Sequence, residues 1–154
     1  MPTMIQFIEN KQQKEQIAKE ILHNLPEWFG LPDSTAEYIR CSQDMPFWAD
    51  IQGEVATGFV ALKETSAHTV EIYVMGVLKA FHRKQIGKQL FDYCLQYAKE
   101  RGYSFMQVKT VKEGCYKEYD STIAFYKQIG FKEFECFPTL WDEWNPCQVL
   151  VIAI

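Results

Sequence analysis

The sequence has few of the residues that build metal and disulfide sites. Its three histidines are isolated from one another, its five cysteines are odd in number and widely spaced, and no CxxC pair occurs. We therefore expect neither a metal site nor a disulfide framework. Cysteines used in this way are typical of a reducing compartment, so we expect a cytoplasmic protein.

Long apolar runs and an excess of positive charge are also missing. No segment reaches the roughly 18 apolar residues of a membrane span, and the N-terminal MPTMIQFIENKQQ has no signal-peptide core. The formal net charge is −4, with acidic and basic residues interspersed, whereas nucleic-acid-binding chains are usually basic. We therefore expect neither a membrane nor a nucleic acid as partner.

Apolar and aromatic residues are plentiful. Of the 154 residues, 47% are hydrophobic and 15% are aromatic, which is enough for a well-packed core. No repeat, low-complexity tract or linker interrupts the chain. We therefore expect residues 1–154 to form a single domain.

Hydrophobic periodicity predicts seven strands and four helices in the order β-α-α-β-β-β-α-β-α-β-β. The strands are expected at residues 4–8, 47–51, 55–63, 70–77, 105–110, 131–137 and 148–154. The helices are expected at 11–24, from an N-cap at Asp33 or Ser34 through 39, at 86–101 and at 121–129. A run of strands that leads into a strand-helix-strand unit predicts an α/β (α+β) fold with a mixed sheet.

The most informative segment is VLKAFHRKQIGKQL, residues 77–90, where a strand passes through a basic turn into a helix. A helix N-terminus presents unpaired N–H groups and the positive end of the macrodipole, which suits a pyrophosphate. Arg83, Lys84 and Lys88 add positive charge, and Gly87 permits close approach of the backbone. An ordinary solvated helix start with surface lysines is the alternative.

This turn resembles the acetyl-CoA-binding motif of the GNAT superfamily of N-acetyltransferases, Q/R-x-x-G-x-G/A. His82 falls at the Q/R position, Gln85 at the first glycine and Gly87 at the second, so one of these three positions matches. Gln85 adds a side chain and is not comfortable at positive φ. We expect the departure to weaken or reshape binding without abolishing it. Residues 122–131, TIAFYKQIGF, resemble the second motif of the family, A-x-x-F-Y-x-x-x-G-F.

The resemblance covers nearly the whole chain and implies a mostly antiparallel sheet flanked by helices, with acetyl-CoA as co-substrate and no metal. It implies that the backbone of Met75, Gly76 and Val77 contacts the pantetheine arm and thioester. A glycine inside a strand suits this role, and a plain bulge is the alternative. The remaining implied cofactor contacts are His82, Arg83, Lys84, Gln85, Ile86, Gly87, Lys88, Tyr119 and Thr122.

Two side chains are candidates for proton transfer. Tyr126 lies where the family commonly places a tyrosine that protonates the departing thiolate, and a phenol with an ordinary pKa near 10 suits that task. A core tyrosine is the alternative. Glu71 resembles the strand glutamate that serves as general base in some members, and a surface or salt-bridged residue is the alternative.

The resemblance therefore implies direct transfer of an acetyl group to an amine of a small molecule or peptide. The acidic net charge favours a cationic amine. A catalytically silent acyl-CoA-binding module is the alternative function. Trp28 and Phe29 either wall the acceptor site or cover the sheet, and the apolar residues 149–154 join either a homodimer interface or the core.

Overall fold

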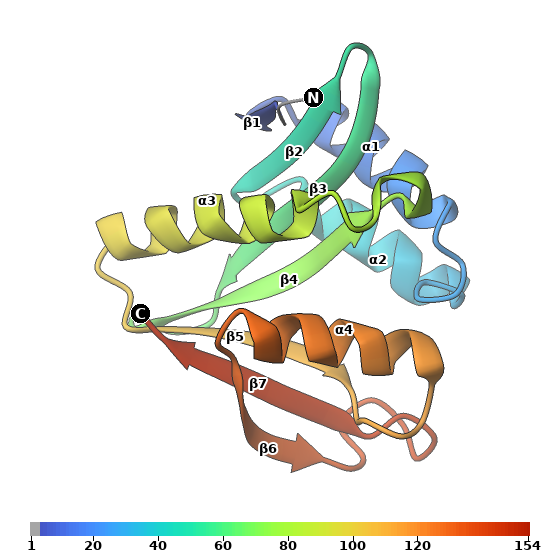
Figure 1. Ribbon diagram of the computed structural model, residues 1–154, viewed down its shortest axis with the longest axis vertical. Coiled ribbons are helices and arrows are strands. Elements are labelled where there is room, and N and C mark those ends of the chain that lie inside the picture. The colour runs from blue at the N-terminus through green and yellow to red at the C-terminus, as the bar shows by residue number, and fades with distance from the viewer. Residues whose placement is uncertain (1–3) are drawn as a thin grey trace. The chain divides into compact units, whose positions relative to one another are not determined.

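The computed structural model describes residues 4–154 (Figure 1). Four helices alternate with seven strands in the predicted order, and a short 3-10 turn, η1 (Lys79–Phe81), follows the fourth strand. The helices are α1 (Lys11–His23), α2 (Pro32–Ser42), α3 (Ile86–Glu100) and α4 (Lys117–Gln128). The strands are β1 (Ile5–Phe7), β2 (Phe47–Gln52), β3 (Val55–Glu64), β4 (Thr69–Val77), β5 (Phe105–Val111), β6 (Lys132–Phe137) and β7 (Cys147–Ala153).

The strands of the described residues form one sheet with the order β1-β2-β3-β4-β5-β7-β6. The pairs β1–β2, β2–β3, β5–β7 and β6–β7 are antiparallel. The predicted mixed α/β fold with a mostly antiparallel seven-stranded sheet is therefore confirmed. The chain divides into two compact units, and the boundary crosses β4: Ile72–Tyr97 belongs with the residues up to Lys63, and Glu64–Glu71 belongs with Ala98–Ile154.

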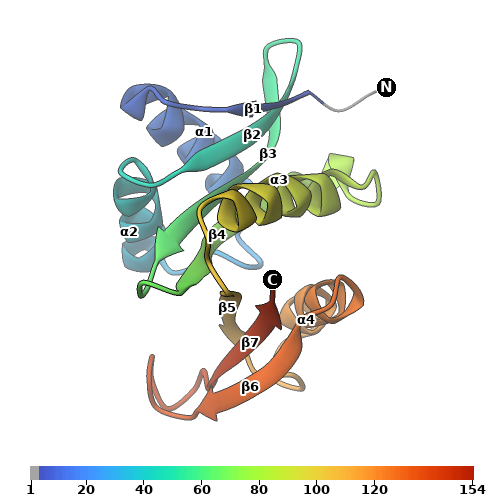
Figure 2. The same ribbon diagram turned by 90° about the vertical axis from the view of Figure 1, so that its left-hand side faces the viewer.

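The first unit is built around the strands β2, β3 and β4. The helices α1 and α2 pack against each other and lie along one face of these strands, whereas α3 crosses the opposite face (Figures 1 and 2). The side chain of Asn10 caps α1 by accepting a hydrogen bond from the Gln13 N–H at 2.9 Å. The core under α1 includes Ile17, Ile21, Leu22, Leu25, Phe47 and Phe59.

The second unit places α4 against β5, next to the antiparallel strands β7 and β6 (Figure 2). The register pairs Phe105 with Ala153 and Val111 with Cys147. Because β7 pairs with β5 on one side and β6 on the other, it offers no free edge. This central position in the sheet agrees with the expectation that residues 149–154 belong to the core. The homodimer stays a prediction.

Two predicted helix starts are wrong. The N-cap of α2 is Leu31, without a side-chain hydrogen bond, and Pro32 occupies the first turn. Proline has the fixed φ that a helix start needs, so Asp33 and Ser34 fall inside the helix. The helix α4 begins at Lys117 and not at 121. The prediction missed its first turn because three of the residues 117–120 are charged and show no hydrophobic period.

None of the helices within residues 4–154 is long and apolar enough to cross a membrane. The longest of them, α3, has 15 residues, which is short of the roughly 20 that a span requires.

Gly76 on β4 is buried where α1 crosses the strand. A Cβ at this position would lie 3.1 Å from both Ile21 Cγ2 and Leu25 Cδ1. Such contacts are tighter than ordinary van der Waals packing, so the absence of a side chain sets how closely α1 approaches the sheet.

We expect Gly76→Ala to lower the free energy of unfolding by about 1–3 kcal/mol, because the added methyl group overpacks the contact with α1. Urea denaturation followed by circular dichroism measures this change. An unchanged midpoint would mean that α1 moves away from β4 without cost.

Candidate active site

The turn between β4 and α3 is held to the sheet at its start. The Leu78 N–H donates a hydrogen bond to the Thr57 carbonyl of β3 at 2.8 Å. The His82 ring then turns back, and its Nε2 lies 2.7 Å from the Val77 carbonyl oxygen. Since a carbonyl only accepts, this nitrogen carries the hydrogen. The Trp28 ring packs edge-on against His82 at 5.9 Å. The predicted cofactor residue His82 therefore clamps the turn through its side chain.

Two residues of this turn adopt the left-handed backbone conformation. Arg83 has φ 63° and Gln85 has φ 67°, and no other non-glycine residue of the described chain has positive φ. A side chain in this region costs about 1–2 kcal/mol. Gln85 thus has the backbone conformation that a glycine adopts most easily, and its side chain makes this conformation energetically unfavourable.

The first amides of α3 are available for hydrogen bonding. The first intrahelical bond runs from the Gln89 N–H to the Gln85 carbonyl at 3.0 Å, so the N–H groups of Ile86, Gly87 and Lys88 precede it. Such groups have no partner inside a helix and point out of its positive end. The side chain of Ile86 is buried and anchors this end of the helix. Local geometry of this kind suits an anion.

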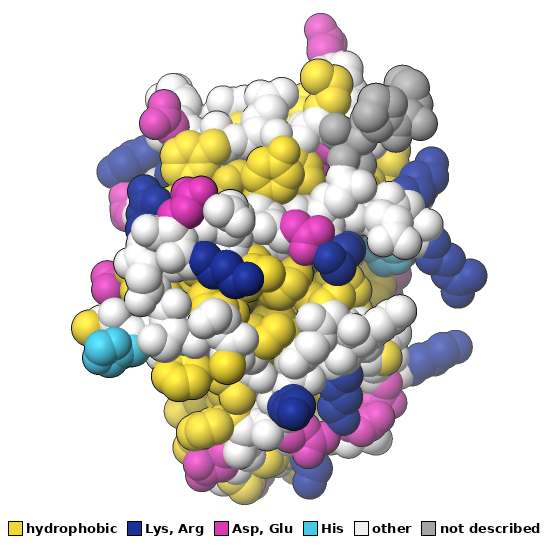
Figure 3. All heavy atoms as spheres, turned by 60° about the vertical axis from the view of Figure 1, so that its left-hand side comes forward, with side chains coloured by type: hydrophobic (Ala, Val, Ile, Leu, Met, Phe, Trp, Pro, Cys, Tyr) yellow, Lys and Arg dark blue, Asp and Glu magenta, His cyan; other side chains and the backbone are white. Residues whose placement is uncertain are grey.

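The cations around the turn are not equivalent. Arg83 and Lys84 are exposed, and Lys84 Nζ lies 5.3 Å from the centre of the Phe81 ring. Lys88 forms an ion pair with Asp92 at 2.7 Å, one turn further along the helix. Arg83 and Lys84 therefore remain as the main positive charges of the turn. On the face drawn in Figure 3, basic and acidic side chains are interspersed.

The end of β4 supplies the residues predicted to hold the thioester. Met75 and Val77 are half-buried. The close approach that glycine permits at position 76 is made by α1, so packing explains this glycine without a ligand. The contacts of the backbone of Met75, Gly76 and Val77 with a cofactor remain a prediction.

Glu71 lies in the second unit and is buried. Its Oε1 accepts a hydrogen bond from Gln107 Nε2 at 2.7 Å and lies 3.3 Å from Lys109 Nζ. These two partners compensate the loss of water around the carboxylate. Nearby, burial raises the pKa of the Cys147 thiol to about 11, which does not favour a nucleophilic thiolate. The role of Glu71 as a base stays a prediction.

The helix α4 carries the other predicted residues. Tyr126 is buried between the rings of Phe125 and Phe131, with centroid distances of 5.2 and 5.4 Å. Thr122 Oγ1 donates a hydrogen bond to the Glu118 carbonyl at 3.2 Å. Tyr119 is half-buried and packs edge-on against Tyr116 at 5.9 Å. These environments satisfy packing and do not by themselves assign a reaction.

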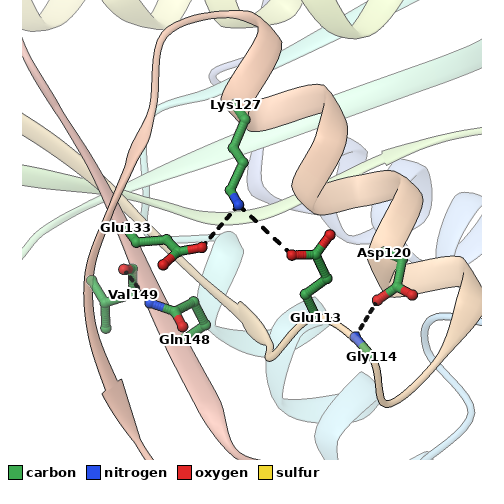
Figure 4. Close-up of polar contacts among 7 residues, drawn as sticks. All are labelled: Glu113, Gly114, Asp120, Lys127, Glu133, Gln148 and Val149. Carbon is green, nitrogen blue, oxygen red and sulfur yellow. Dashed lines mark hydrogen bonds and ion pairs between the residues drawn. The ribbon is translucent and has the colours of Figure 1, made fainter.

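A polar network that the sequence did not reveal surrounds α4 (Figure 4). Lys127 forms ion pairs with Glu133 at 2.8 Å and with Glu113 at 3.8 Å. The hydrogen bond with Lys127 lowers the pKa of Glu133. Asp120 Oδ1 accepts a hydrogen bond from the Gly114 N–H at 2.8 Å. The network ties α4 to the loop before it and to β6. Across residues 4–154, no group of three or more His, Cys, Asp or Glu side chains is placed to hold a metal ion.

The order of the strands and helices agrees with a known family. Residues 13–131 match the family model of the acetyltransferase (GNAT) family. The chain belongs to this family. The seven-stranded sheet and four helices described above agree with this membership, and the correspondence of the basic turn to the acetyl-CoA motif of the family stays a prediction.

Individual relatives of the GNAT family are distant. The chain is 26% identical over 102 residues to the uncharacterized N-acetyltransferase YsnE of Bacillus subtilis (strain 168), and the match spans 66% of each chain. It thus covers just under two thirds of that relative. The structure of Ard1 from Thermoplasma volcanium has a TM-score of 0.79 at 16% identity, covering 100% of this chain and 99% of that one. A GNAT acetyltransferase from Elizabethkingia anophelis with acetyl-CoA bound has a TM-score of 0.71 at 15% identity, covering 99% and 98%.

The strain at Gln85 makes a measurable prediction. We expect Gln85→Gly to leave the free energy of unfolding unchanged or to raise it by up to about 1 kcal/mol, because relief of the left-handed strain offsets the entropy of glycine. Gln16→Gly, in the exposed interior of α1, is the control and should cost about 1 kcal/mol. Equal losses in the two variants, measured by thermal or urea denaturation, would show that Gln85 is not strained.

Proposed function

We propose that the chain is an N-acetyltransferase that moves an acetyl group from acetyl-CoA to an amine of a small molecule or peptide. The observation that carries the proposal is the set of N–H groups at Ile86, Gly87 and Lys88, which precede the first intrahelical hydrogen bond beside Arg83 and Lys84. This combination suits the diphosphate of coenzyme A. Membership of the GNAT family and the structural relative with bound acetyl-CoA support it.

The reaction sets three chemical requirements. The acceptor nitrogen must be neutral to attack the thioester carbonyl, so it loses a proton before or during attack. The oxyanion that forms needs a hydrogen-bond donor, and we assign this role to a backbone N–H within Met75, Gly76 and Val77, whose backbone also contacts the pantetheine arm. When the C–S bond breaks, the thiolate of coenzyme A takes a proton, which we assign to the Tyr126 hydroxyl.

The acceptor amine is the less defined partner. The name of the Bacillus subtilis relative supports nitrogen as the acceptor atom, and the net charge of −4 favours a cationic molecule. Glu71 is our candidate base for the acceptor proton. Because its carboxylate is held by Gln107 and Lys109, it acts through a water or after one of these contacts opens.

Calorimetry with acetyl-CoA, followed by a thiol-release assay with a panel of amines, tests the proposal. We expect binding, and release of free coenzyme A with at least one cationic amine. Binding without thiol release for any amine would support the silent acyl-CoA-binding module instead. The absence of heat with acetyl-CoA would overturn both.

Arg83→Ala combined with Lys84→Ala should weaken acetyl-CoA binding roughly tenfold and flatten its salt dependence, because two positive charges of the turn are lost. Lys132→Ala on β6 is the control for loss of a surface charge.

The role of Tyr126 makes a separate prediction. Loss of a general acid typically costs about 10²–10⁴-fold in turnover, so we expect Tyr126→Phe to lower kcat by at least roughly tenfold while acetyl-CoA affinity is retained. Tyr93→Phe, on the exposed side of α3, removes a phenol hydroxyl outside the proposed chemistry and should leave kcat unchanged. Equal kcat in the wild-type protein and Tyr126→Phe would remove Tyr126 from the mechanism.

A further inference from the structure

Both ends of the basic turn rest on the same two residues of β3, Thr57 and Gly58. At the start of the turn, the Leu78 N–H donates to the Thr57 carbonyl at 2.8 Å. At its end, a Cβ placed on Gly58 would lie 3.2 Å from Ile86 Cγ2. The chain thus leaves the sheet at Thr57 and returns, as the first residue of α3, against Gly58.

The contact at Gly58 is tight on the side of β4 as well. The same added Cβ would lie 3.1 Å from Val77 Cγ2 and 3.2 Å from the Gly76 carbonyl oxygen. The last of these is backbone and cannot swing aside. Glycine at position 58 therefore lets β4 and the start of α3 approach β3 together.

Thr57 is itself held by a side-chain hydrogen bond to Asp50 of β2. Asp50 is fully buried, and its carboxylate accepts hydrogen bonds from Thr57 Oγ1 at 2.5 Å, from Gln52 Nε2 at 2.9 Å and from the Met4 N–H at 2.7 Å. Among residues 4–154, no ion pair involves this carboxylate, so these donors compensate its burial. A buried carboxylate with this set of donors holds Thr57 in one rotamer and one position.

The left-handed backbone of the turn requires that both of its ends be held by the surrounding structure. Residues at positive φ such as Arg83 and Gln85 persist only where the surrounding structure over-determines them. The turn has two such residues between two fixed ends. If either end were free, the backbone would relax toward negative φ and the amides of α3 would change direction.

We propose that Asp50, Thr57 and Gly58 are positioning residues for the acetyl-CoA turn. The hydrogen bond that the Thr57 hydroxyl donates to Asp50 fixes Thr57. The Thr57 carbonyl in turn fixes the exit of β4, and Gly58 makes room for the first residue of α3. The inference rests on the proposed function, because it assigns these residues to the diphosphate-binding turn. None of the three needs to touch the cofactor.

The test compares two buried threonines in the same unit. Thr57→Val removes the hydroxyl bonded to Asp50, and Thr35→Val removes a hydroxyl that donates to the Phe29 carbonyl at 3.0 Å, away from the turn. Both changes keep the shape of the side chain, and the melting temperature of each variant measures the general loss of stability. We expect Thr57→Val to weaken acetyl-CoA binding about tenfold and Thr35→Val to leave it within about twofold.

Hydrogen exchange of the free proteins supplies a readout that does not need the ligand. Amides of residues 78–88 should exchange faster in Thr57→Val than in Thr35→Val, and Gly58→Ala should act in the same direction from the other end of the turn. Equal affinities and equal exchange in the two threonine variants would overturn the inference. If the wild-type protein itself binds no acetyl-CoA, the proposed function fails, and the exchange comparison still decides whether Thr57 positions the turn.

Discussion

The close packing of backbone at the end of β4 is the constraint on which the candidate site depends. Gly76 lets α1 approach one face of the strand, and Gly58 lets β4 and the start of α3 approach β3 on the other. Because a methyl group at either position would press against its neighbours at 3.1–3.2 Å, the packing restricts the direction in which the chain leaves β4. This direction sets the course of the turn that follows, and the course of the turn sets the orientation of the first amides of α3.

An anion site built from backbone N–H groups does not require a positively charged protein. The chain is acidic, with a net charge of −4, yet the groups that we propose for anion binding are backbone N–H groups together with two exposed cations, Arg83 and Lys84. Backbone donors are independent of side-chain identity, which explains how Gln85 can stand where glycine is usual in the GNAT family. The cost appears instead as a left-handed backbone at Gln85.

The order of elements could be predicted from the sequence because strong hydrophobic periods mark the core-facing residues of α1, α3 and the long strands. The basic turn could be found because a strand end, cations and a helix start are adjacent in the chain. The contacts of Asp50 with Thr57 and of Thr57 with Leu78 could not be found, since they join separate strands and carry no local pattern. The late start predicted for α4 has a related cause: three of the residues 117–120 are charged and the segment has no hydrophobic period. Contacts such as that of Asp120 with Gly114 support its place in the helix.

Amide chemical shifts of the ¹⁵N-labelled protein, titrated with coenzyme A, test most directly whether the start of α3 grips the diphosphate. The account predicts the largest shifts at the N–H groups of Ile86, Gly87 and Lys88, with little change at exposed amides of β6 such as Phe134. Saturable binding that leaves the three α3 amides unmoved would contradict it.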